Sequence, residues 1–147
     1  MTLENLLAIH RLVAHEPSRE SITKLLTAAA RNIADAKVTS ISGENRFDAA
    51  YKAIMQCAMA ALWANGYRTS TSQPGHHQTA IQALSKTIGL DNDTVIVLDA
   101  LRKQRNVSDY VGDPISDGAV DACIANANLL YKRVSGWIRA NRPNLFD

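Results

Sequence analysis

Two arginines and an aspartate lie close together in the segment 102–110, on what reads as one face of a helix. The apolar run 94–101 comes directly before this segment and predicts a helix that continues through it. At about 100° per residue, three charged side chains lie within roughly 40° of Leu98, namely Arg102, Arg105 and Asp109. Because charged groups on a core-facing stripe need partners, the spacing predicts a helix that begins in the core and ends in a polar site.

The arginine pair, Arg102 and Arg105, is suited to an anion or phosphate site. A guanidinium presents a fixed fork of N–H donors, and a neighbouring carboxylate such as Asp109 orients it. Asn106 and Tyr110 would add hydrogen-bonding groups at the edge of this site. The alternative is an ordinary ion pair within the helix between Arg105 and Asp109, which contributes roughly a few tenths of a kcal/mol.

A second polar cluster comprises Tyr67-Arg68 and, after a polar loop, His76-His77. Adjacent histidines at the start of a helix can ligate a metal or act as acid and base near neutral pH. Their side chains diverge by about 100° on a helix, and no cysteine or histidine follows at helical spacing, so we expect no metal here. The remaining interpretations are a helix cap, a packed histidine, or a place in the polar site of the arginine pair.

Other familiar catalytic patterns are missing from the sequence. The glycines lack the spacing of a phosphate-binding loop, no serine stands in a nucleophile elbow, and no pair of carboxylates stands out. His10 and His15 read as surface or interface residues. We therefore expect no bound cofactor.

Composition favours one helical domain over residues 1–147. Hydrophobic residues make up 46% of the chain but aromatic residues only 5%, which favours helices packed on small side chains over a β-sandwich. The net charge of +2 permits nucleic-acid binding without indicating it. Cys57 and Cys123 fall in apolar helical patterns and are expected to be buried reduced thiols; a disulfide or a metal role is the alternative.

The sequence also indicates a cytoplasmic protein. No apolar run approaches the length of a membrane span. The first four residues carry no basic region ahead of an apolar one, so we expect no signal peptide.

Hydrophobic periodicity and capping residues predict the elements that hold these side chains. Ser18, Asp91 and Ser116 are candidate helix caps, and Gly66 and Gly89 are candidate helix stops. The expected helices span residues 3–14, 18–38, 44–65, 76–88, 92–107 or 92–110, and 117–140, with a polar loop at 67–75 and a frayed tail after 141. The strand-like run 95–98 is expected to be helical because its flanks are.

Six short stretches, taken in order, resemble the HEPN superfamily, and more narrowly its small bacterial single-domain members. The stretches are 47–54, 65–68, 74–77, 101–102, 105–106 and 109–110, so the resemblance covers the chain from about Ser42 to the final helix. It implies an all-α, up-and-down bundle of four main helices with extra short helices. Residues 1–41 would be N-terminal helices, 42–140 the motif-bearing core and 141–147 a tail. Such proteins usually form homodimers through the face that holds the polar motif.

The resemblance also implies a function. Many HEPN proteins are metal-independent ribonucleases, and several are toxins of toxin–antitoxin pairs, often with a nucleotidyltransferase partner. Their motif is an arginine, often followed by a polar residue, with a histidine about four to six residues after the arginine. Arg102 or Arg105 matches the arginine and Asn106 matches the polar residue. Asp109 and Tyr110 stand where the histidine would be, and no histidine follows His77.

An aspartate does not replace an imidazole as acid or base at neutral pH without a large pKa shift. We therefore expect a module that binds RNA, DNA or a nucleotide, in a toxin–antitoxin or phage-defence setting. One alternative is a divergent ribonuclease that uses the same arginines with His76 or His77 from elsewhere in the fold or from a second subunit. The other is a non-catalytic dimeric interaction protein in which the arginine–aspartate stripe bridges subunits.

Overall fold

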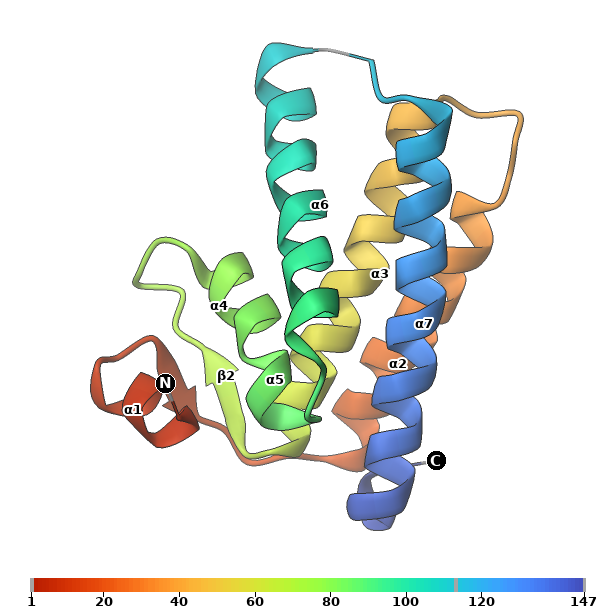
Figure 1. Ribbon diagram of the computed structural model, residues 1–147. Helices are drawn as coiled ribbons and strands as arrows, with labels where there is room; N and C mark the ends of the chain where they lie inside the picture. Colours follow the sequence, from red (N-terminus) through yellow and green to blue (C-terminus); the bar gives the residue numbers. More distant parts are fainter. Residues whose placement is uncertain (1, 113, 147) are drawn as a thin grey trace.

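The computed structural model describes residues 2–112 and 114–146, and at positions 108–111 it describes the backbone of a helix but not the side chains. The chain is mostly helical, which confirms the expected all-α class (Figure 1). The longest helices are α2 (Arg19–Ala36), α3 (Gly43–Ala64), α6 (Asn92–Val111) and α7 (Asp117–Asn141). Shorter helices are α1 (Leu3–Ala8), α4 (His76–Gln82) and α5 (Leu84–Thr87).

Helix α3 is the centre of the fold and contacts α2, α4, α5, α6 and α7 (Figure 1). Its apolar residues lie on several sides of the helix, and such a helix is stable only when neighbouring helices cover each of those sides. Phe47, Tyr51 and Ile54 fill the interior, while buried alanines let the neighbouring helices approach closely. Helix α3 is therefore buried on several sides.

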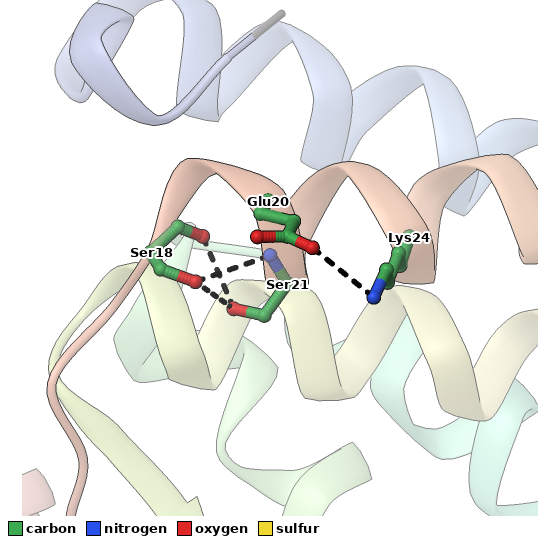
Figure 2. A network of polar contacts seen from close by, with 4 residues as sticks. All are labelled: Ser18, Glu20, Ser21 and Lys24. Atoms are coloured by element: carbon green, nitrogen blue, oxygen red, sulfur yellow. Dashed lines mark hydrogen bonds and ion pairs between the residues drawn. The ribbon is translucent and has the colours of Figure 1, made fainter.

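The start of α2 shows how local sequence sets a helix boundary (Figure 2). The Ser21 amide donates to Ser18 Oγ at 3.1 Å, which satisfies one of the amides left without a partner at a helix start. The Ser18 hydroxyl also donates to Ser21 Oγ at 2.7 Å. The Lys24–Glu20 ion pair beside it, at 3.3 Å, is fully solvated and adds little stability.

The other predicted boundaries of the long helices are confirmed within one or two residues. Asp91 Oδ2 accepts a hydrogen bond from the Thr94 amide at 3.0 Å, and Ser116 Oγ accepts one from the Ala119 amide at 3.2 Å. Gly66 follows α3 with a φ of +90°, the left-handed geometry that favours glycine.

The expected first helix over 3–14 is wrong beyond Ala8. Strand β1 (Leu12–Ala14) pairs antiparallel with β2 (Tyr67–Thr69), with Leu12 opposite Thr69 and Ala14 opposite Tyr67. β2 also replaces the first part of the expected loop at 67–75. Strands of three residues are too short to show an alternating pattern, and a partner some 55 positions away is invisible to local periodicity.

Two further expectations are corrected. The helix expected over 76–88 is divided into α4 and α5, and the Lys86 amide donates to the Ala83 carbonyl at 2.8 Å in a tightened turn. The tail expected to be frayed contains a short 3-10 helix, η1 (Pro143–Leu145). Leu145 is buried, and the Arg139 guanidinium lies 4.5 Å from the centre of the Phe146 ring. The tail is therefore packed against the helices through Leu145 and Phe146.

Both cysteines are free thiols buried in the hydrophobic cluster, as expected. Burial raises the pKa of Cys57 and of Cys123 to about 12. Among the described residues, no helix is both long enough and apolar enough to cross a lipid bilayer.

Candidate functional site

Helix α6 places the arginine pair on a core-facing stripe, as the spacing predicted. Leu98 and Leu101 are buried and anchor the helix against its neighbours. The side chains of Arg102 and Arg105 follow on the same face and are only 15% and 33% exposed. The side chains of Asp109 and Tyr110, which were predicted to complete this stripe, lie outside the described residues.

Arg102 is held by an aspartate of its own helix. Its Nε donates to Asp99 Oδ1 at 2.8 Å, and Lys103 Nζ lies 3.6 Å from Asp99 Oδ2. Burial raises the pKa of Asp99, but the hydrogen bond and charge of Arg102, aided by Lys103, outweigh burial and lower this pKa below its ordinary value. Asp99 is therefore a carboxylate that orients Arg102.

Arg105 reaches across to helix α3. Its Nε lies 3.6 Å from Asp48 Oδ1, and its guanidinium carbon lies 5.2 Å from the centre of the Tyr51 ring. A guanidinium over an aromatic face is attracted by the negative charge of that face. Arg105 thus joins α6 to α3 through an ion pair and a cation–π contact.

Helix α4 places His77 against Tyr51 and near the arginine pair. The Tyr51 hydroxyl lies 3.2 Å from His77 Nδ1, and the two rings are 6.0 Å apart. Burial lowers the pKa of His77, and the nearby His76, Arg105 and Arg102 lower it further. Both arginines therefore lie within electrostatic reach of His77. We refer to Asp48, Tyr51, His77, Arg102 and Arg105 as the central site.

Tyr51 connects the two halves of the central site because it contacts both His77 and Arg105. Burial raises its pKa to about 12, although the two arginine charges oppose this shift. The phenol consequently stays protonated at neutral pH and can donate to His77 Nδ1. When the Tyr51 hydroxyl donates to Nδ1, the proton of a neutral His77 lies on Nε2.

A cavity of about 370 Å³ opens between α3, α4 and α6. This volume is within the range of about 300–1,000 Å³ that small-molecule sites occupy. Gln56 in its wall is held in place by Asn32, whose Nδ2 donates to Gln56 Oε1 at 2.8 Å. The lining side chains combine cations, one acid, one histidine and an apolar wall: Asp48, Tyr51, Lys52, Met55, Gln56, Met59, His77 and Arg105.

The other predicted site residues are less involved. His76 is exposed and packs edge-on against His77, with ring centres 4.8 Å apart. Tyr67 and Arg68 belong to β2 and do not line the cavity, and Asn106 is exposed on α6. Of the two histidines, the structure thus places only His77 in the cavity wall with Arg105. The other four side chains do not line this cavity.

Three side chains of the central site and its surroundings were not identified from the sequence. Asp48 and Tyr51 were considered only within a helical segment, and Asp99 was not considered at all. Each carries a signal, because Asp48 precedes Tyr51, and Asp99 precedes Arg102, by the three residues that place side chains together on a helix. The contacts of Asp48 and Tyr51 on α3 with Arg105 on α6 could not be predicted from that spacing.

Comparison of the sequence with models of known protein families gave no match, and comparison with curated proteins gave no significant relative. Among the described residues, no three histidine, cysteine, aspartate or glutamate side chains gather as they would around a metal ion.

Proposed function

We propose that the protein is a HEPN-like helical module that binds nucleic acid or a nucleotide through the central site. The observation that carries the proposal is the meeting of Arg105, Lys52 and His77 around one cavity, with Arg102 held nearby. Guanidinium groups recognise phosphate through several donors at once, and the Met55 side of the cavity offers an apolar surface. A nucleotide presents both a phosphate and an apolar base.

The aspartates beside the arginines are compatible with phosphate binding. Arg102 donates to Asp99 through its Nε–H, and a guanidinium carries four further N–H donors. A carboxylate that fixes one edge of a guanidinium lowers the entropy lost when the other edge binds a ligand. Asp99 therefore supports recognition by holding Arg102 in position.

A binding titration with a labelled single-stranded RNA, and with mononucleotides as competitors, tests this proposal. Replacing Arg102→Ala together with Arg105→Ala should weaken RNA binding by at least about a hundredfold, because hydrogen bonds to charged groups are worth about 1.5–3 kcal/mol each. The control is Arg31→Ala with Lys37→Ala, two exposed cations of α2 and its C-terminal end. Absence of wild-type binding to both the RNA and the mononucleotides, or an equal loss in the control, would contradict the proposal.

A divergent ribonuclease is the second candidate, and the position of His77 favours it. The lowered pKa of His77 keeps its imidazole neutral at pH 7, the form that accepts a proton from an attacking hydroxyl. The side chain stands beside the arginine pair in space although it precedes the pair by 25 positions or more in the sequence. It thereby supplies the group that the HEPN pattern has after its arginine.

Incubation of purified protein with RNA and a chelator tests this candidate. Cleavage should be abolished by His77→Ala and retained by His76→Ala, whose exposed side chain is the matched control. RNA that stays intact after long incubation with the wild type would exclude a ribonuclease while leaving the binding proposal open. The homodimer, the toxin–antitoxin or phage-defence setting and a nucleotidyltransferase or antitoxin partner remain predictions from the resemblance alone.

A further inference from the structure

A second cavity, of about 360 Å³, lies on another side of α4. Gln78 and Gln82 line it and lie about 100° and 140° around the helix from His77, so the two cavities open on different faces of α4. We refer to it as the outer cavity. Its lining residues come from α1, from the residue before β1, and from α4, α5 and the residue joining them: Leu6, Arg11, Gln78, Thr79, Gln82, Ala83, Ser85 and Lys86.

Two cations from distant parts of the chain line the outer cavity, and no carboxylate of the described residues does. Arg11 and Lys86 are both exposed. Neither makes an ion pair with any side chain that the structure describes. Since two like charges beside one cavity repel each other, an anion between them would relieve this repulsion.

The backbone holds Arg11 firmly in this position. Its amide donates to the Leu6 carbonyl at 3.0 Å, and its carbonyl accepts from the Ser70 amide at 3.0 Å. His10, directly before it, has a φ of +63°, a left-handed geometry that is uncommon for a residue with a Cβ. Such residues are often found beside ligand sites because the surrounding structure must maintain the strain.

The neutral side chains of the outer cavity add hydrogen-bond donors. Gln78 and Gln82 each carry an amide group with two N–H donors. The Arg11 guanidinium makes one long hydrogen bond, from Nη1 to the Pro74 carbonyl at 3.5 Å, which leaves it further donors. Together these groups offer more donors than the two oxygens of a carboxylate require. They match the three terminal oxygens of a phosphate monoester.

We propose that the outer cavity binds a phosphate group, with Arg11 and Lys86 as its charged ligands and the amides of Gln78 and Gln82 as neutral ones. The site is separate from the central site, and its existence does not depend on the function proposed for that site. Its ligand chemistry can come from a free phosphorylated small molecule or from the backbone of a nucleic acid.

Titrations with inorganic phosphate, pyrophosphate and a single-stranded oligoribonucleotide, followed by NMR of the backbone amides, test this site. We expect pyrophosphate to shift the amides of Gln78, Gln82 and Lys86. Arg11→Gln with Lys86→Gln should weaken this binding roughly tenfold or more, because both charged ligands are lost. The charge-matched control, Arg31→Gln with Lys37→Gln, should bind as the wild type does.

The outcomes separate the two sources of phosphate. If the oligoribonucleotide shifts the same amides, the phosphate belongs to a nucleic acid; if only the small anions do, it belongs to a free small molecule. The proposal is overturned if no probe shifts these amides, or if the control pair weakens binding as much as the double variant. Lys86→Gln alone is a second test that spares Arg11, and unchanged binding in this variant also counts against the proposal.

Discussion

The central site and the outer cavity share a helix, a similar volume and two cations each, yet their charges are organised differently. Arg102 and Arg105 are half-buried and lie against the carboxylates of Asp99 and Asp48. Arg11 and Lys86 are exposed and lie beside a cavity that is lined by no carboxylate from the described part of the chain. A carboxylate partner fixes the direction of a guanidinium but reduces the net positive charge of the site. Cations without such a partner leave the full positive field to attract an anion.

This difference suggests a division of roles. The central site has an ordered set of contacts that runs from Asp48 through Arg105 and Tyr51 to His77. Such order suits selective recognition or proton transfer. The outer cavity offers charge and donors with few side-chain contacts among them, which suits attachment of a phosphate without further discrimination.

The largest expected effect comes from removing the ring on which the central site is built. Tyr51 is 2% exposed, and Tyr51→Ala should lower the free energy of unfolding by about 3–5 kcal/mol. Tyr51→Phe keeps the ring and should cost about 1 kcal/mol through the lost hydroxyl. Arg11→Ala in the outer cavity should change it by about 0.5 kcal/mol or less. Urea unfolding followed by circular dichroism measures all three.

Equal destabilisation by Tyr51→Ala and Arg11→Ala would remove the distinction between an ordered and a loosely organised site. Equal destabilisation by Tyr51→Ala and Tyr51→Phe would show that the ring contributes little beyond its hydroxyl, against the packing described for α3.

A smaller effect is expected in the pH dependence of stability. The pKa of His77 is lowered from its ordinary 6.5 in the folded protein, so between the lowered value and 6.5 the unfolded chain binds more protons. Its contribution to stability is therefore complete above about pH 6.5 and decreases as the pH falls below it. His77→Gln should reduce the fall in stability seen between about pH 7.5 and pH 5.5.

His76→Gln is the matched control for this measurement, since it keeps His77 and its contact with Tyr51. The control should retain most of the wild-type fall in unfolding free energy. An NMR titration of the His77 ring gives the pKa directly. A value at or above 6.5 would show that burial and the arginine pair do not act on His77 as described.

The sequence predicted those features of the fold that depend on neighbours in the chain. Ser18, Asp91 and Ser116 cap the helices they were expected to cap, because a cap bonds only two or three residues ahead. The stripe of Leu98, Arg102 and Arg105 followed from helical spacing alone. Pairing of β1 with β2 could not be predicted, because it depends on residues from two distant segments.

The same limit applies to the candidate site. The arginine pair was predicted from its face on α6, but its partners Asp48 and Tyr51 belong to α3. His77 was a candidate from the sequence, but its neighbours could not be predicted, because they depend on the packing of α4 against α3 and α6. Charge, spacing and residue type indicate which side chains are unusual; helix packing decides which of them meet.

The central claim is that the central site binds the phosphate of a nucleic acid or a nucleotide, and for nucleic acid it is tested most directly by the salt dependence of RNA binding. Each phosphate contact contributes about 0.7 to the slope of log affinity against log salt for a single strand. We predict that Arg102→Ala with Arg105→Ala reduces the magnitude of this slope by the amount that about one to two lost phosphate contacts would remove. The comparison is with the wild type and with Arg31→Ala plus Lys37→Ala. An unchanged slope in the arginine-pair variant, or wild-type binding that does not depend on salt, would contradict the account.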